Sequence, residues 1–355
     1  PKPPEPTNGG DTTIKDPDKK PDIVGGDEPP QPSKGLGSDG LKYKYQIVLD
    51  ALDEFGVNVS RHDTEPYLEG PGFYIVRVVP GHGVRPEAVM DRTDELKLKL
   101  QLPAYHTPRT YIDGGAVIFE IPKTDEERYP VSAEELWART NAQDHQGTLY
   151  VPVGEDIRGN VVGINFSSSD SPHLLIAGTT GSGKSIALEA LLRGLCHFYP
   201  PEDLQLNLVD PKGTELASFE EDPHLMQSIG FDAEDAIGLL NEAVDEMQRR
   251  YKILREHKVR DITAYKQAAH DSEDIPWRLV VLDEYADLTS DKDDRKAVED
   301  AVRRLSQKAR ACGIHVILAT QKPSHNVIST IIRSNLTVQL ALRVNTSSDS
   351  RIIMD

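Results

Sequence analysis

A glycine-rich turn between an apolar strand and a helix is the strongest chemical signal in this sequence. Residues 173–192 read HLLIAGTTGSGKSIALEALL, which contains the spacing G-x-x-x-x-G-K-S. Glycines let the backbone adopt conformations that a Cβ would hinder, so that successive N–H groups point at phosphate oxygens. The spacing predicts a P-loop in which Lys184 reaches the β- and γ-phosphates of ATP and Ser185 holds Mg²⁺. The predicted nucleotide-binding residues are Gly178, Thr179, Thr180, Gly181, Ser182, Gly183, Lys184 and Ser185.

Two acids follow a second apolar run about a hundred residues later. Residues 279–282 read LVVL and lead into Asp283 and Glu284. In P-loop NTPases the aspartate at this place takes part in the Mg²⁺ shell. The adjacent glutamate can accept a proton from the attacking water. An apolar strand that ends in Asp-Glu is common, but after a P-loop it predicts hydrolysis and not only binding.

Gln321 ends the next apolar run, where residues 314–321 read IHVILATQ. Ligands of parallel sheets lie at the carboxyl ends of the strands, so we expect Gln321 to face the γ-phosphate. There it would orient water or sense the phosphate. The alternative is an ordinary amide at a strand end.

Composition limits the possible partners. The 355 residues are 37% hydrophobic and contain no run of eighteen apolar residues, which predicts no membrane contact. The net charge of −18 argues against a generally basic nucleic-acid coat, although DNA binding in a narrow channel needs only a local ring of positive groups. Cys196 and Cys312 lie in apolar, apparently buried contexts without metal-ligand spacing, which fits a reducing cytosol and predicts a cytoplasmic protein.

The chain divides into three predicted regions. Residues 1–40 are rich in Pro, Gly, Asp and Lys and cannot offset their ordering entropy, so we expect a disordered linker. Residues 41–150 predict a small α/β domain with a helix from Tyr43, strands at 72–79 and 115–122, and a helix at 87–100 between them. His82, in a turn of this domain, is expected at the surface.

Residues 151–355 predict an α/β core of the RecA-like P-loop NTPase class. Two short strands within 149–166 precede the P-loop strand. Helices at 232–257 and 295–312 then alternate with apolar strands, and the last strand lies near 337–344. Uninterrupted apolar strands indicate a parallel sheet buried on both faces. The sequence starts at Pro1 and stops in mid-pattern at Asp355, so we expect an excerpt of a longer protein, with this domain incomplete at its C-terminus.

These motifs together resemble those of a known family. The segments LIAGTTGSGKS, LVDPKGTEL, VVLDEYADL, RLSQKARACGIHVILATQKPS and IIRSNLTVQLALRVNTSSDSRIIMD are similar to successive motifs of the FtsK/SpoIIIE DNA translocases, in the HerA–FtsK superfamily of hexameric ATPases. The resemblance runs from about residue 153 to 355. It implies ATP and Mg²⁺ as cofactors, with Asp283 and Glu284 at the metal and water and Gln321 as sensor. It also implies a ring of six subunits and sequence-independent binding of double-stranded DNA.

Nucleotide sites between subunits need a cation from the neighbour to stabilise transition-state charge. Arg351, Arg343, Arg333 and Arg310 are the candidates, and each could instead be a surface salt-bridge partner. We favour Arg351 because the family has an arginine in the same DSR setting.

The sequence is therefore compatible with three functions. The first is an ATP-driven DNA translocase, in chromosome segregation and division or in a DNA-defence or restriction system. The second is a similar motor that powers protein secretion, which the negative charge slightly favours. The third, a non-hydrolysing nucleotide-binding scaffold, is disfavoured because Glu284 and Gln321 are both present.

Overall fold

The computed structural model describes residues 35–268, 274–325 and 327–354. The linker predicted for residues 1–40 lies mostly outside this part. Helix α1 (Gly37–Glu54) already begins at Gly37, earlier than the predicted start at Tyr43. Among the described residues, none of the helices combines the length and the apolar character that crossing a bilayer requires.

A parallel five-stranded sheet forms the core of the C-terminal region, as the sequence predicts. Its strand order is β12-β8-β11-β10-β9, and every neighbouring pair is parallel. The strands are β8 (Leu174–Ala177), β9 (Leu204–Val209), β10 (Trp277–Leu282), β11 (Ile314–Thr320) and β12 (Val338–Ala341). All residues of β8, β10 and β11 are buried, because helices cover both faces of the sheet.

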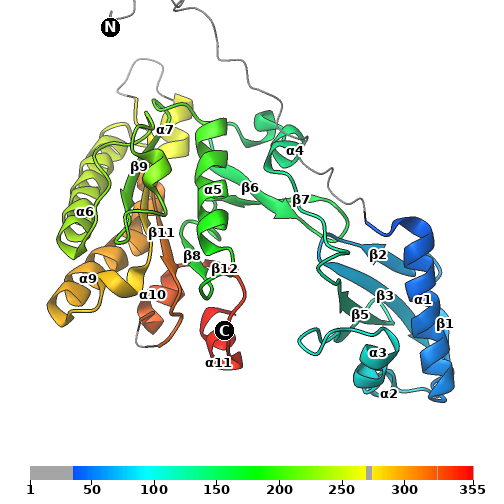
Figure 1. The fold of residues 1–355 in the computed structure, drawn as a ribbon. Helices are drawn as coiled ribbons and strands as arrows, with labels where there is room; N and C mark the ends of the chain where they lie inside the picture. The colour runs from blue at the N-terminus through cyan, green and yellow to red at the C-terminus, as the bar shows by residue number, and fades with distance from the viewer. Residues whose placement is uncertain (1–34, 269–273, 326, 355) are drawn as a thin grey trace, which may run out of the picture.

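Helices pack on both faces of this sheet (Figure 1). Helix α5 (Lys184–Phe198) lies on one face, and α6 (Ala233–Glu256) and α9 (Lys292–Lys308) lie together on the other. Shorter elements complete the region: η2 (Ala217–Phe219), α7 (Ile262–Ala268), α8 (Tyr285–Leu288), η3 (Ala309–Cys312), α10 (Thr330–Asn335) and α11 (Ser347–Met354). The side chain of Asp232 caps α6 and that of Asp291 caps α9, each accepting from a first-turn amide.

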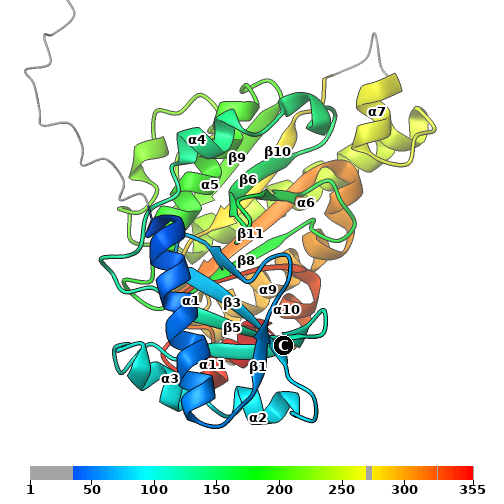
Figure 2. The ribbon, with the colours of Figure 1, turned by 90° about the vertical axis from the view of Figure 1, so that its right-hand side faces the viewer.

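The N-terminal region is built on an antiparallel sheet. Strands β1 (Val59–Arg61), β3 (Phe73–Pro80), β5 (Ala116–Pro122) and β4 (Arg109–Asp113) pair in that order, and β2 (Tyr67–Glu69) pairs with β3. Helix α1 crosses one face of this sheet, as Figure 2 shows, and buries Tyr45, Val48 and Leu52 against it. The short strands β1, β2 and β4 were not predicted from the sequence.

The helix predicted for residues 87–100 is two helices, α2 (Pro86–Met90) and α3 (Thr93–Lys99). The break occurs where the Thr93 hydroxyl donates to the Met90 carbonyl at 2.6 Å, which satisfies the end of α2 locally. His82 is exposed, as expected.

A hairpin connects the two regions in sequence. After α4 (Ala133–Ala138) and η1 (Ala142–His145), strands β6 (Tyr150–Glu155) and β7 (Val161–Asn165) pair antiparallel, which confirms the two short strands predicted there. Asp156 holds the turn, because its carboxylate accepts from the amides of Arg158 and Asn160 at 2.8 and 2.9 Å.

Two histidines are buried in the parallel core without exposed surface. The His315 Nδ1 lies 2.9 Å from the Pro172 carbonyl, and the His173 Nδ1 accepts from the Val316 amide at 3.0 Å. Both Nε2 atoms lack partners within the described residues. Burial lowers the pKa of His173 to about 4 and that of His315 to about 3, with His173 and then Arg250 and Arg310 adding to the effect on His315.

We predict that acid destabilises this core. Because both folded-state pKa values lie below the unfolded value of 6.5, the unfolded chain binds more protons, and stability falls as the pH drops below 6.5. Each histidine should cost up to about 1.4 kcal/mol per pH unit between pH 6 and 5. Urea unfolding of the wild type and of His315→Gln at pH 7, 6 and 5 measures this. An equal acid slope in the two proteins would contradict the assignment.

Candidate active site

The P-loop lies between β8 and α5, at the carboxyl end of β8, which pairs with the central strand β11. A Cβ on Gly178 would lie 2.5 Å from the Ser182 hydroxyl and 2.7 Å from the Leu342 Cβ, so only glycine fits. Gly181 and Gly183 have φ values of 73° and 93°, in the left-handed region. Within the described part of the chain, their amides have no hydrogen-bond partner and are available to phosphate oxygens.

The first turn of α5 differs from those of α6 and α9. Gly183 occupies the cap position and supplies no side chain, and no acid lies in the first turn. Helix α6 has Glu234 and Asp235 in its first turn, and α9 also carries acids there. Because acids normally stabilise a helix N-terminus, their absence from α5 leaves its positive end open to an anionic ligand.

Strand β11 and the segment after β12 anchor the P-loop. The Gly178 amide donates to the Thr320 carbonyl at 3.2 Å, and the Thr179 amide donates to the Arg343 carbonyl at 2.9 Å. The Arg343 guanidinium donates to the Gly181 carbonyl at 3.2 Å. The loop is therefore held by two neighbouring strands as well as by its own helix.

Lys184 and Asp283 form a buried ion pair. Lys184 is 3% exposed and Asp283 is fully buried, and the Lys184 Nζ contacts the Asp283 Oδ1. The second oxygen of Asp283, Oδ2, is buried without a donor among the described residues. Burial raises the pKa of Asp283, Lys184 opposes this shift, and the nearby Asp210 adds to it. A cation bound at Oδ2 would relieve this cost.

Glu284 is fixed to the end of the neighbouring strand. Its backbone has φ 49° and ψ 61°, a left-handed conformation that is rare for a residue with a side chain. The Thr320 hydroxyl donates to Glu284 Oε1 at 3.0 Å, and the backbone N–H of Gln321 donates to both carboxylate oxygens at 3.2 Å. The Thr180 hydroxyl donates to the Gln321 side-chain oxygen at 2.8 Å. Gln321 therefore connects Glu284 to the P-loop, through its backbone N–H on one side and its side-chain oxygen on the other.

These residues fit a nucleotide with a divalent cation. The free loop amides and Lys184 would hold phosphate oxygens, and Ser182 has a buried hydroxyl without a described partner beside them. Ser185 lies half-buried on the first turn of α5, where its hydroxyl would join Asp283 at Mg²⁺. The orphaned Asp283 Oδ2 is the feature that fits a metal best.

The four candidate arginines lie in different surroundings. Arg343 is bonded to the P-loop of its own chain, and Arg333 donates to the Ile352 carbonyl at 3.1 Å. Arg351, on α11, and Arg310, on η3, are exposed and have no ion pair among the described residues. Of the four candidates, Arg351 and Arg310 are therefore the two whose side chains make no hydrogen bond or ion pair within the described residues and can reach another chain.

Two residues of this site have no role in the sequence prediction. Thr320 binds Glu284, and Asp210 ends β9 fully buried, where its carboxylate accepts from the amides of Lys212, Glu215 and Leu216. Asp210 follows an apolar parallel strand as Asp283 does, and that shared pattern was the signal available in the sequence.

The cysteines are free, and Cys312 is buried, but Cys196 is only half-buried and so departs from the expectation. Cys196 lies near Asp222 and His224, with possible ligand atoms within 4.8 Å of one another. The His224 ring nitrogens already contact Asp222 at 2.7 Å and the Tyr199 carbonyl at 2.8 Å. In this arrangement His224 has no ring nitrogen left for an ion.

Several known proteins resemble this chain in sequence. Residues 134–325 match the model of the FtsK/SpoIIIE family. A protein of Streptococcus agalactiae named DNA translocase FtsK is 34% identical over 343 residues, covering 94% of this chain and 40% of that protein. The protein of the same name from Pseudomonas aeruginosa is 31% identical and covers 91% and 42%. The chain thus spans about 40% of the length of these curated relatives.

Two solved structures share the fold. The pCW3 conjugation coupling protein TcpA, in its monomer form with ATPgS, superposes with a TM-score of 0.57 at 21% identity, covering 88% of this chain and 86% of that one. The cytoplasmic domain of the type VII secretion ATPase EccC from Thermomonospora curvata gives a TM-score of 0.52 at 26% identity, covering 63% and 27%. The family model covers more than half of the chain, including the P-loop, Asp283, Glu284 and Gln321, and the chain therefore belongs to the FtsK/SpoIIIE family.

Proposed function

We propose that this chain is the motor part of an ATP-dependent double-stranded DNA translocase. The observation that carries the proposal is the hydrogen-bond chain from Glu284 through Gln321 to Thr180. A candidate base connected through Gln321 to the phosphate-binding loop suits coupled hydrolysis, whereas a binding scaffold does not need it. The motor would act in the cytoplasm and with other domains of a longer protein.

In this mechanism each residue has one task. Lys184 and the loop amides hold the phosphates, and Ser185 and Asp283 hold Mg²⁺, which supplies charge neutralisation when bound. Glu284 accepts a proton from the attacking water, and Gln321 orients that water or reports the presence of the γ-phosphate. Because Gln321 bonds to both the loop and Glu284, a change at the phosphate would move the candidate base.

The choice of DNA as cargo rests on the relatives named DNA translocase, which match over more than nine tenths of this chain. The alternative, a motor for protein secretion, is favoured by the 26% identity to a type VII secretion ATPase and slightly by the net charge of −18. That match covers less of the chain, and we therefore prefer DNA. The motor would serve chromosome segregation and division or a DNA-defence system.

We predict that linear duplex DNA stimulates ATP hydrolysis and that the stimulation fades as salt rises. A motor that follows the phosphate backbone releases counterions on binding, so its apparent DNA affinity falls steeply with salt. Steady-state phosphate release with and without DNA at two salt concentrations measures this, with Lys184→Ala as the blank. Hydrolysis that is indifferent to DNA would favour the secretion motor.

We predict that Glu284→Gln lowers kcat by about 100- to 10,000-fold while ATP still binds, because the amide keeps an oxygen acceptor but cannot take a proton. Phosphate release and binding of a fluorescent ATP analogue measure the two properties. Thr320→Val is the matched control: it removes one hydrogen bond to Glu284 and should cost much less. Full turnover in Glu284→Gln would refute its role as base.

We further propose a hexameric ring in which Arg351 reaches the nucleotide of a neighbouring subunit. Arg351→Ala and Lys184→Ala chains should each be inactive, but their mixture should regain part of the activity. Mixed rings would contain interfaces with both residues intact. The same mixture made with Arg310→Ala tests the other exposed candidate. Activity regained with Arg310→Ala, while Arg351→Ala alone stays active, would transfer the role to Arg310.

A further inference from the structure

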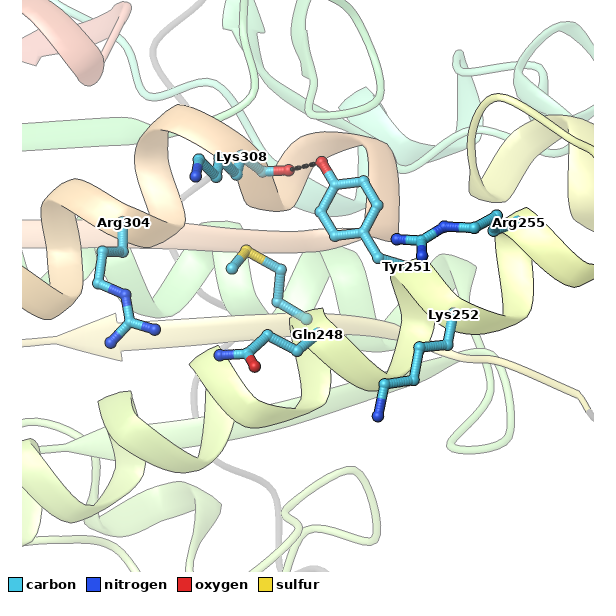
Figure 3. Close-up of a pocket in the computed structure, with 7 residues that line it drawn as sticks. Gln248, Tyr251, Lys252, Arg255, Arg304 and Lys308 are labelled. Atoms are coloured by element: carbon cyan, nitrogen blue, oxygen red, sulfur yellow. Dashed lines mark hydrogen bonds between the residues drawn. The ribbon is translucent and has the colours of Figure 1, made fainter.

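A groove of about 480 Å³ lies between α6 and α9, on the side of these helices away from the sheet. Figure 3 shows cationic side chains from both helices around it, Lys252 and Arg255 from α6 and Arg304 and Lys308 from α9. Met247 lies between the helices, and the Tyr251 hydroxyl donates to the Lys308 carbonyl at 2.6 Å. This bond ties the two helices together and fixes the shape of the groove.

The four cations of this groove have no ion pair among the described residues, and all four are exposed. Their neighbours are different: Arg250 is paired with Glu246 at 2.7 Å, and Arg303 is paired with Asp300 at 3.2 Å. The groove therefore keeps positive charge that none of the described acids neutralises through an ion pair.

The sequence around the groove is also strongly basic. Residues 248–260 contain six Lys or Arg and one acid, and residues 303–312 contain four Lys or Arg and no acid. The whole chain has the opposite balance, with 58 acids against 40 Lys and Arg. A quarter of the Lys and Arg residues thus gather in these two short segments.

Helix dipoles explain only part of this concentration. The negative C-terminal end of a helix favours cations within its last turn, by about 0.3–1 kcal/mol each. That accounts for Arg255 in α6 and Lys308 in α9, both last-turn residues. Lys252 and Arg304 each lie one turn earlier, where the dipole has little effect. The dipole also does not explain why acids are scarce in residues 248–260 and 303–312.

We infer that this groove binds the sugar-phosphate backbone of duplex nucleic acid, at a surface separate from the P-loop; the inference rests on the proposed DNA motor. Both helices present their C-terminal halves, whose dipoles disfavour an enclosed single anion. A spread row of phosphates suits this surface better, since cations at i, i+3 and i, i+4 repeat about every 4.5–6 Å along the helices.

Charge also determines where on the surface the duplex binds. The duplex carries one negative charge per about 1.7 Å, and the acidic remainder of this chain repels it. Lys252, Arg255, Arg304 and Lys308 therefore attract the backbone to one place without reading base sequence. The binding should be tight only at low salt and equal for unrelated sequences.

The test is the double variant Arg304→Gln/Lys308→Gln, compared with Lys42→Gln/Arg85→Gln. The control variant removes the same number and types of charge from exposed positions on α1 and beside α2, which also lack ion pairs among the described residues. Anisotropy of a labelled duplex, titrated at several salt concentrations, gives the slope of log affinity against log salt. We expect this slope to become less steep by about 1.8 in the groove variant, at about 0.9 per phosphate contact.

The possible results distinguish a failure of the groove assignment from a failure of the proposed function. ATP hydrolysis without DNA and the thermal midpoint should stay at wild-type values in both variants, because the groove lies outside the nucleotide site. An unchanged slope alongside DNA-stimulated hydrolysis would overturn the groove assignment and leave the motor intact. Lost self-association with unchanged DNA binding would overturn it too, by assigning the groove to contacts between copies. No DNA binding by the wild type would refute the proposed function itself.

Discussion

The buried pair of Lys184 and Asp283 is the contact on which the arrangement of this site depends. It connects the P-loop, which follows β8, to the carboxyl end of β10, two strands away in the sheet. Removing either partner would leave an uncompensated buried charge, a change that typically costs about 3–5 kcal/mol. The pair still leaves Asp283 Oδ2 without a donor. The ion pair that connects these two strands therefore also leaves one carboxylate oxygen available to bind a cation.

Strand β11, which lies between β8 and β10, imposes a second constraint. Glu284 stays in a left-handed conformation, which costs about 1–3 kcal/mol, because Thr320 and the Gln321 amide hold its carboxylate. The Thr320 carbonyl accepts the Gly178 amide, so the same residue fixes both the P-loop and Glu284. A shift of β11 relative to its neighbours would displace both at once. The position of β11 in the sheet would therefore determine the geometry of the proposed hydrolysis site.

The parallel core and the positions of its chemical residues were predictable because each depends on local sequence. An apolar run long enough to form a buried strand is followed directly by a polar residue, as at Asp283 and Gln321. Because the strands are parallel, both residues lie at the carboxyl edge of the sheet. The antiparallel region was less predictable. Strands β1 and β2 span three residues each and are defined only by pairing with β3, a tertiary contact. The bonds of Arg343 and Thr320 to the P-loop likewise join distant segments, and no local pattern encodes them.

The uneven charge of the molecule follows from the geometry of a parallel α/β core. Helices that connect parallel strands run back antiparallel to them, so their N-termini gather at the carboxyl edge of the sheet and their C-termini at the amino edge. Acids in the first turns of α6 and α9, and cations in their last turns, match those dipoles. Helix α5 lacks the acids, which leaves its N-terminus free for phosphate. A net charge of −18 is therefore compatible with local attraction of anions, because the first turn of α5 lacks acids and the last turns of α6 and α9 carry cations.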